Sequence, residues 1–213
     1  IGHFGLGFYS AFMPSDSVEI DSLSYQPGAK AAKWFCDGSM EYEMTEGTRT
    51  ERGTAITLHI AEDSKEFLEE YTVRQILDKY CSFLPVEIYL TIAGGEEPKQ
   101  EDGKEPEAPK PINDVHPLWM KAPKDCTEEE YKDFYRKVFM DFNEPLFWIH
   151  LNVDFPFNLK GILYFPKLNH EFAGTEGQIK LYNSQVFVAD NVKEVIPEFL
   201  MLLKGVIDCP DLP

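Results

Sequence analysis

One stretch of the chain limits its fold more than any other, because it contains almost no residue that can anchor a hydrophobic core. Residues 94–111, GGEEPKQEDGKEPEAPKP, hold six acidic residues, three lysines, four prolines and three glycines. A segment of this composition cannot bury enough apolar surface to offset the conformational entropy that folding removes. We therefore expect a charged flexible linker at 94–111 between two domains, at 1–93 and 112–213. The alternative is a long surface loop within one domain, although structureless loops beyond about 12–15 residues are uncommon.

Hydrophobic periodicity on both sides of the linker predicts a mixture of strands and helices. Before it, a helical stripe covers 66–83, and strands are expected at 18–23, 33–36, 40–44, 54–60 and 86–92. After it, Thr127 and Glu130 form a capping-box pattern that begins a helix. A second helix is expected at 192–204 with Gly205 as its end, and strands at 147–153, 159–165, 178–182 and 185–188. The predicted fold class is α/β (α+β), with mainly antiparallel strands.

The net charge limits which partners the chain can have. With 37 acidic and 20 basic residues the formal charge is −17, so a nucleic-acid backbone would be repelled, and no local basic stripe opposes this. No apolar run approaches the ~20 residues that span a bilayer, and the N-terminus has no signal-peptide pattern. We expect neither a nucleic acid nor a membrane as partner.

The distribution of cysteines, histidines and serines offers no metal centre or catalytic group. The sequence has no CxxC pattern and no histidine at ligand spacing, and its cysteines lie far apart, at Cys36, Cys81, Cys126 and Cys209. Reduced thiols of this kind are typical of a cytoplasmic protein. No serine has the neighbours of a nucleophilic triad, so we expect no catalytic residue in the chain itself.

A glycine-rich turn at residues 2–8, GHFGLGF, enters an apolar stretch that is expected to be helical. Glycines allow the backbone to approach an anion closely, and the free amides at a helix start favour phosphate oxygens. The turn is neither a Walker A loop nor a dinucleotide fingerprint. On its own it is as compatible with a simple turn as with a phosphate site.

Thr54 begins the predicted strand at 54–60, in the sequence Arg52-Gly53-Thr54. Threonine at a strand start is usually explained by its preference for β structure. Its hydroxyl could also reach the edge of a base or a water beside one, and periodicity does not distinguish these roles.

Taken together, these two motifs resemble the 90-kDa heat-shock chaperones, most closely the bacterial HtpG type. Residues 1–12, IGHFGLGFYSAF, resemble the end of the ATP lid of that family, and residues 52–60, RGTAITLHI, resemble its later nucleotide-pocket strand. The resemblance extends over nearly all of the chain outside the linker, including 80–88, 117–119, 129–135, 180–182 and 204–213. Because the chain begins within the first motif, the resemblance implies an internal piece of a longer protein.

The resemblance implies a specific architecture and specific binding residues. Residues 1–93 would be the C-terminal half of a gyrase/histidine-kinase-type ATP-binding sandwich, and 112–213 the first α/β subdomain of the client-binding middle domain. Thr54 would help to recognise adenine, and ATP would be bound by the segment Gly2, His3, Phe4, Gly5, Leu6, Gly7 and Phe8. His3 replaces the glutamine that is usual in the family, a tolerable change where the backbone makes the contacts. Trp119 would contact clients, and partly buried packing is the alternative role for this side chain.

The implied function is the ATP-dependent folding and remodelling of client proteins as part of a stress response. ATP and Mg²⁺ would be the cofactors, unfolded or partly folded clients the partners, and a C-terminal region outside this chain would form the homodimer. The family's general-base glutamate and Mg²⁺-binding asparagine lie before residue 1, and its phosphate-binding arginine lies after residue 213. The parent would be an ATPase, and the piece would not. A nucleotide-independent protein-binding scaffold is the alternative, and the charge disfavours a gyrase-type ATPase.

Overall fold

The computed structural model describes residues 6–93, 110–167, 178–191 and 202–211. The chain forms two compact units, Ile1–Gln75 and Ile76–Pro213. Each unit contains one sheet, so the mixed α/β (α+β) fold class is confirmed. Within the described residues, none of the helices has the length and apolar character needed to cross a membrane.

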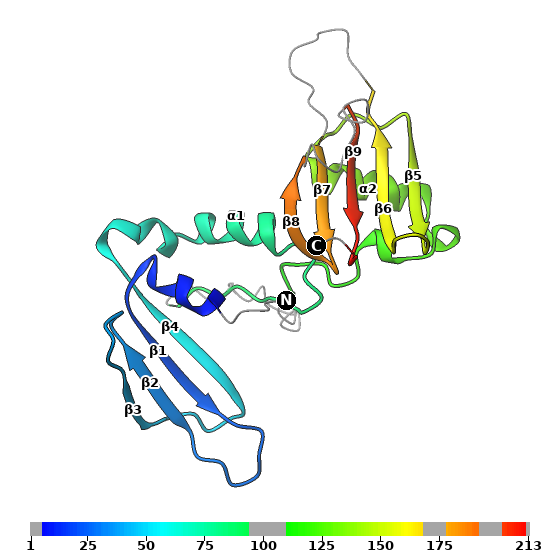
Figure 1. Cartoon of the computed structure of the whole chain (residues 1–213). Helices are drawn as coiled ribbons and strands as arrows, with labels where there is room; N and C mark the ends of the chain where they lie inside the picture. The colour runs from blue at the N-terminus through cyan, green and yellow to red at the C-terminus, as the bar shows by residue number, and fades with distance from the viewer. Residues whose placement is uncertain (1–5, 94–109, 168–177, 192–201, 212–213) are drawn as a thin grey trace, which may run out of the picture. The chain divides into compact units, whose positions relative to one another are not determined.

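The first unit is built on an antiparallel sheet in which the strand order is β3-β2-β1-β4 (Figure 1). A short 3-10 helix, η1 (Leu6–Phe12), precedes the sheet. Its strands are β1 (Ser15–Leu23), β2 (Ala32–Cys36), β3 (Glu43–Glu46) and β4 (Gly53–Ile60). All four strands correspond to predicted ones, with bounds that differ by a few residues.

The single helix predicted at 66–83 is two helices in the structure. The 3-10 helix η2 (Glu62–Leu68) ends at Glu69, which is extended with φ −80° and ψ 125°, and α1 (Glu70–Tyr80) follows. An extended residue interrupts the helical hydrogen bonds, so the continuous apolar stripe was a misleading signal. The boundary between the two compact units falls within α1.

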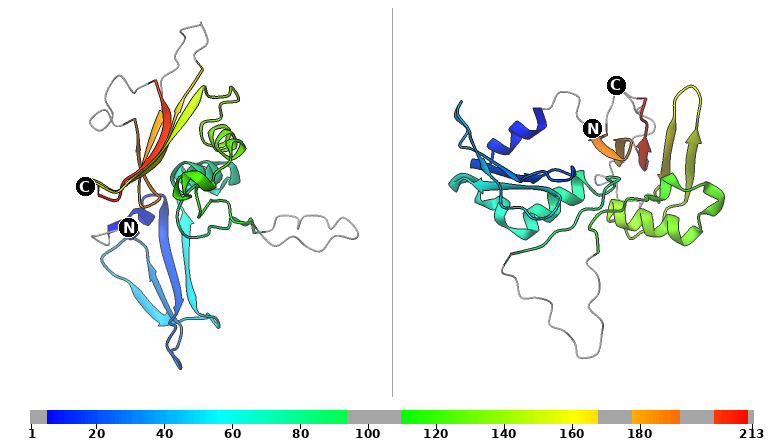
Figure 2. Two further views of the ribbon diagram at one scale, coloured as in Figure 1. Left: turned by 90° about the vertical axis from the view of Figure 1, so that its right-hand side faces the viewer. Right: turned by 90° about the horizontal axis from the view of Figure 1, so that it is seen from below.

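The second unit is a five-stranded sheet with the order β5-β6-β9-β7-β8 and one parallel pair, β7 with β9. Two short 3-10 helices, η3 (Leu118–Met120) and η4 (Pro123–Asp125), precede α2 (Glu128–Phe139). The strands are β5 (Phe147–Val153), β6 (Leu159–Phe165), β7 (Gln178–Asn183), β8 (Val186–Asp190) and β9 (Lys204–Asp208). Within this unit, α2 covers one face of the sheet (Figure 2).

The capping box predicted at the start of α2 is confirmed. The Thr127 hydroxyl accepts a hydrogen bond from the Glu130 amide at 3.3 Å, and the Glu130 carboxylate accepts one from the Thr127 amide at 2.8 Å. The helix ends at Met140, which adopts the left-handed conformation with φ 49°. This cap fixes where α2 begins, and therefore which of its side chains point at the sheet.

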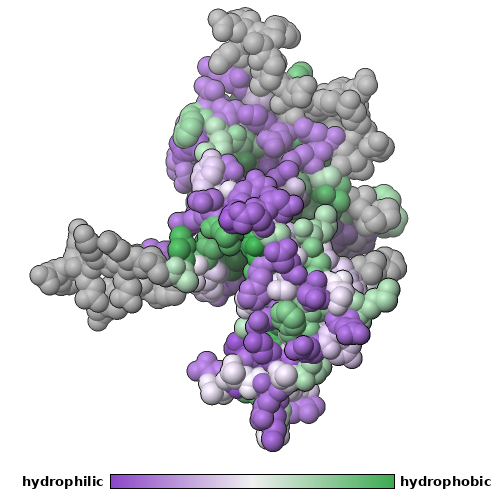
Figure 3. Space-filling view, turned by 90° about the vertical axis from the view of Figure 1, so that its left-hand side faces the viewer, coloured by the Kyte–Doolittle hydropathy of each residue, from purple (hydrophilic) through white to green (hydrophobic). Residues whose placement is uncertain are grey.

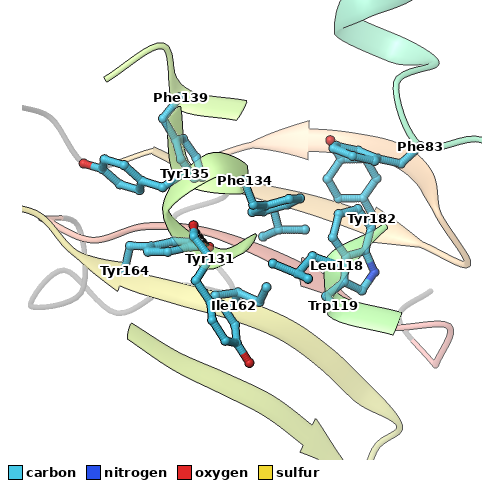
Figure 4. Packing of buried hydrophobic residues seen from close by; sticks show 11 residues of the cluster. Phe83, Leu118, Trp119, Tyr131, Phe134, Tyr135, Phe139, Ile162, Tyr164 and Tyr182 are labelled. Carbon is cyan, nitrogen blue, oxygen red and sulfur yellow. Dashed lines mark hydrogen bonds between the residues drawn. The ribbon is translucent and has the colours of Figure 1, made fainter. Parts of the chain in front are cut away.

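An aromatic core joins α2 to the sheet of the second unit (Figure 4). Trp119 is 1% exposed, and its indole nitrogen donates a hydrogen bond to Asp208 Oδ2 at 3.1 Å. The Tyr164 hydroxyl donates to the Tyr131 carbonyl oxygen at 2.9 Å, which ties β6 to the helix. The other buried members are Phe83, Leu118, Phe134, Tyr135, Phe139, Ile162, Tyr182 and Val206.

Both ends of segment 94–109 belong to the second unit. Asn113 is buried, and its side chain accepts a hydrogen bond from the Ile88 amide and donates to the carbonyl oxygens of Leu84 and Val86, each at 2.8 Å. Residues 86–92, which were predicted as a strand, lie outside any strand, and the Ile88 amide and carbonyl oxygen bond to the Asn113 side chain and the Ile112 amide. The division at 94–111 stays a prediction.

The prediction that Gly205 ends a helix is wrong, since Gly205 lies within β9. A Cβ atom at this position would lie 2.6 Å from Leu163 Cδ2 and 2.8 Å from the Ile162 carbonyl oxygen. The glycine is therefore explained by a close approach of neighbouring strands rather than by a helix end. Most of the helix predicted at 192–204 lies outside the described residues.

Candidate functional site

One face of the first sheet is apolar, and the strand register defines it. Val18 on β1 lies opposite Cys36 and Leu58, and Ile20 lies opposite Trp34 and Ile56. Directly paired residues project from the same face of a sheet, and successive residues along a strand alternate between faces. Ile56 and Leu58 remain exposed on this face.

The helix η1 lies on the apolar face. The Phe8 ring packs edge-on against Trp34 with 5.7 Å between ring centroids, and Phe12 does so at 6.5 Å. Within η1 the Ser10 hydroxyl donates to the Gly7 carbonyl oxygen at 2.6 Å. Aromatic packing therefore fixes the end of the glycine-rich motif against the sheet.

Thr54 projects from the same face as η1. It begins β4 directly opposite Ser22, two positions along β1 from Ile20, and the two hydroxyl oxygens lie 2.7 Å apart. Its side chain is exposed, so the hydroxyl is open to a ligand. The structure thus brings Thr54 and the residues Gly7 and Phe8 to one face, although they are far apart in the sequence.

The structure describes only some of the other residues that were predicted to bind the phosphates. Gly2, His3, Phe4 and Gly5 lie outside the described residues, and Leu6 begins η1. A Cβ atom added at Gly7 would meet no other atom within 4 Å, so the space beside this backbone is open. That openness fits an approach of a ligand to the chain at Gly7.

Sequence reasoning missed a hollow beside η1. A cavity of about 390 Å³ is lined by Phe8 and Phe12 of η1, Trp34 and Cys36 of β2, and Tyr42. Half of its lining residues are aromatic, a character that suits flat apolar groups. The alternation of Trp34 and Cys36 along β2 was the signal that could have assigned both to the apolar face.

The opposite face of the first sheet is polar and internally paired. Glu19 Oε2 lies 2.7 Å from Lys33 Nζ, and His59 Nε2 lies 3.3 Å from Glu19 Oε1. Hydrogen bonding to Lys33, followed by that to His59, lowers the Glu19 pKa below its usual value despite partial desolvation. Because Glu19, Lys33 and His59 on this face pair with one another, the apolar face is the better candidate for binding an apolar group.

The second unit presents apolar side chains on its surface. Phe155 is 86% exposed and Phe142 is 80% exposed, and Met140, Leu146, Phe147, Ile149 and Phe157 are also exposed. Figure 3 views the left-hand side of Figure 1, away from β5, and there hydrophobic side chains are interspersed with hydrophilic ones. Large apolar side chains with this degree of exposure are candidates for contact with other proteins.

The structure places Trp119 in the core rather than on this surface. Its ring packs against Phe83 at 4.6 Å, Tyr182 at 5.3 Å and Phe134 at 5.8 Å between centroids. With 1% of the residue exposed, the ring cannot touch a client in this conformation. The expected client contact of Trp119 is therefore corrected: the side chain has the packing role that was the alternative.

Metal ligands do not gather in the part of the chain that the structure describes. No group of three or more histidine, cysteine, aspartate or glutamate side chains there is arranged to hold an ion. All four cysteines are free thiols, and burial raises the pKa of the Cys81 thiol.

Comparisons with known proteins identify relatives along the whole chain. The sequence profile of the family described as Hsp90 protein matches residues 94–213. The chain is 53% identical over 215 aligned residues to the chaperone protein HtpG of Bacteroides fragilis, covering all of this chain and 31% of that protein. It is 49% identical to HtpG of Porphyromonas gingivalis and 39% identical to HtpG of Desulfitobacterium hafniense, again over all of this chain, covering 31% and 32% of those proteins. The chain thus spans about a third of the length of these relatives.

Proposed function

Because the chain belongs to the Hsp90 protein family, we propose that it is part of a molecular chaperone that folds and remodels client proteins in an ATP-dependent cycle. The observation that carries the proposal is the exposed apolar surface of the second unit, where Phe142 and Phe155 are almost fully accessible. An unfolded client exposes apolar side chains of its own, and contact between the two removes both from water. The cytoplasm is the proposed location.

The proposed architecture follows the family. Residues 1–93 are assigned to the C-terminal half of a gyrase/histidine-kinase-type ATP-binding sandwich, 94–111 to a linker, and 112–213 to the first subdomain of the middle domain. In the structure the last part of the first range, residues 76–93, packs as part of the second unit. The apolar face of the first sheet supports the first assignment, since a face that carries exposed Ile56 and Leu58 requires a covering layer. The remaining length of the relatives can supply that layer.

ATP is the proposed ligand of the first unit. Thr54 and the Gly7–Phe8 backbone fit such a ligand, because both lie on one face, the Thr54 hydroxyl is exposed and the space at Gly7 is open. When bound, ATP would supply the free energy of phosphoryl transfer to the cycle. The amides of residues 5–8 would hold its phosphates, and Thr54 would orient its base. Mg²⁺ would be bound by residues outside this chain.

The chain by itself is proposed to lack ATPase activity. Phosphoryl transfer requires a positioned nucleophile, a metal ion and charge stabilisation together. The family places those groups outside residues 1–213, and it places the dimer contact in a C-terminal region outside them as well. Purified chain mixed with ATP and Mg²⁺ should release no phosphate above the no-protein control, and turnover that purifies with the chain would contradict the assignment.

Client binding is tested by the suppression of aggregation. A thermally unfolding client such as citrate synthase is heated with the 213-residue chain, and light scattering reports aggregation. We expect suppression by the wild type and several-fold weaker suppression by the double variant Phe142→Ser, Phe155→Ser. Tyr25→Ser is the matched control, because Tyr25 is an exposed aromatic of the first unit. A wild-type chain without effect, or equal effects of the two variants, would remove the basis of the proposal.

A further inference from the structure

Strand β5 is an open edge of the second sheet (Figure 1). It pairs with β6 in an uninterrupted antiparallel register from Phe147↔Phe165 to Val153↔Leu159. No described strand pairs with its other side. Half of the backbone amides and carbonyls of an edge strand point outward, and they can form a ladder with another extended chain.

This edge lacks the protection that natural edge strands usually carry. Its sequence, FWIHLNV, contains no lysine, acid, glycine or proline, and its register has no bulge over seven residues. The opposite edge, β8, is five residues long, ends in Asp190 and has a register irregularity in its pairing with β7. Charge, bulges and short length discourage unwanted pairing, so their absence at β5 indicates an edge that is kept for binding.

The covered face of β5 holds the strand in place. Trp148 stacks on Tyr131 of α2 with 5.0 Å between centroids and 26° between ring planes. The ring nitrogens of His150 lie 2.7 Å from the Tyr131 hydroxyl and 3.4 Å from the Trp119 carbonyl oxygen. A strand fixed on one face loses little entropy when a second chain pairs with its edge.

The other face of β5 presents apolar side chains at alternate positions. Phe147, Ile149 and Val153 are each 40–49% exposed, and Phe147 stacks on Phe165 of β6 with 4.0 Å between centroids. A chain added beside β5 would project every second side chain next to this row. The row therefore favours a segment whose apolar residues alternate with polar ones.

Acidic groups lie at both ends of the strand. Asp154 follows Val153 directly and is exposed, and Glu144 precedes the strand with 64% of its side chain exposed. Lys132 is shared between Glu144 at 3.3 Å and Glu128 at 2.9 Å, so carboxylates outnumber ammonium groups in these contacts. The whole chain carries a formal charge of −17. Basic residues at the ends of a bound segment would complement this charge.

We propose that β5 binds an extended client segment as an added strand, one with alternating apolar residues and basic flanks. The inference rests on the proposed chaperone function and specifies the conformation and chemistry of what is bound. The outward backbone groups of β5 supply the hydrogen bonds, and the row of Phe147, Ile149 and Val153 selects the side chains.

A fluorescent peptide in which valine and threonine alternate between flanking lysines tests the proposal on the 213-residue chain by fluorescence anisotropy. We expect Ile149→Lys to weaken binding at least tenfold. Val188→Lys is the matched control, because Val188 is 54% exposed on the opposite edge strand, and it should stay within twofold of the wild type. The same peptide with glutamates as flanks should bind at least tenfold more weakly. Equal loss in both variants, or equal binding of both peptides, would overturn the proposal.

Backbone pairing is tested separately from side-chain contact. N-methylation of every core residue of the peptide removes its amide donors while keeping the side chains, and we expect at least a tenfold loss of binding. Amide hydrogen exchange should slow at alternate residues of β5 when the unmodified peptide binds. Undiminished binding of the methylated peptide, or protection without alternation, would show that strand addition is wrong.

Two further outcomes separate this inference from its premise. Suppression of aggregation by a chain that does not bind the peptide would reject strand addition while leaving the chaperone function standing. Loss of both activities would reject the proposed function itself. The edge could instead pair with a second copy of the chain, which size-exclusion chromatography tests. If the wild type is a dimer and Ile149→Lys is a monomer, the β5 edge binds a second copy and the client proposal is overturned.

Discussion

Phe83 should contribute a large share of the stability of the second unit, although it precedes the charged segment in the sequence. It is 4% exposed, and its ring packs on Trp119 at 4.6 Å, Tyr182 at 5.6 Å and Phe134 at 5.9 Å between centroids. Truncation of a buried phenylalanine to alanine costs about 3–5 kcal/mol through lost transfer free energy and the cavity that remains. The three aromatic contacts favour the upper half of that range.

Urea denaturation followed by tryptophan fluorescence measures this effect. The chain has three tryptophans, of which Trp34 lies in the first unit and Trp119 and Trp148 lie in the second. In a Trp34→Phe background the signal therefore reports the second unit. With a denaturant slope of about 2 kcal/mol per molar urea, a loss of about 4 kcal/mol lowers the midpoint by about 2 M.

The exposed Phe142 provides the matched control for the same chemical change. Phe142→Ala removes the same atoms from a side chain that is 80% exposed, and it should alter the unfolding free energy by less than about 0.5 kcal/mol. If Phe83→Ala and Phe142→Ala have the same urea midpoint of unfolding, the assignment of Phe83 to the core of the second unit is refuted. A shift of the expected size would place residue 83 energetically with the second unit.

Two other changes test the electrostatics and capping of the second unit. Burial raises the Asp141 pKa, but its ion pair with Lys204 at 2.6 Å and the Tyr135 hydroxyl outweigh burial and hold it at about 2. The resulting stability, about 2 kcal/mol, is present above pH 4 and is lost as the pH falls through 2. Urea midpoints measured across this range should fall in the wild type and less in Asp141→Asn. Thr127→Ala removes the α2 cap and should cost about 1 kcal/mol in the same assay, whereas Thr127→Ser should cost less.

Local signals in the sequence predicted the elements whose structure depends on local interactions. The Thr127 capping box begins α2, and β5 and β6 have the bounds that their alternation indicated. A cap depends on residues three apart, and alternation depends on one buried face, so neither requires knowledge of distant partners. The helix break at Glu69 had no counterpart in the stripe at 66–83, because one extended residue scarcely alters the periodicity.

Features that depend on distant contacts could not be predicted in this way. Gly205 looked like a helix end, and only the approach of Leu163 on a neighbouring strand explains why no side chain fits there. Trp119 could be assigned either to a surface or to a core until Asp208, 89 residues later, was found to accept its indole hydrogen bond. The common face of Thr54 and η1 likewise follows from strand register, which the sequence alone did not define.

The two sheets differ in what their exposed apolar residues require. In the first sheet Ile56 and Leu58 lie on the same face as η1. They belong to a broad apolar face, which requires a second layer to cover it. In the second sheet α2 already covers one face, and the exposed residues Phe147, Ile149 and Val153 follow a single edge strand. A folded layer can bury a broad apolar face, whereas one extended chain can form hydrogen bonds with the unpaired backbone groups of an edge. The client segments that we propose as partners lack stable structure, so they would match the β5 edge better than the face beside η1.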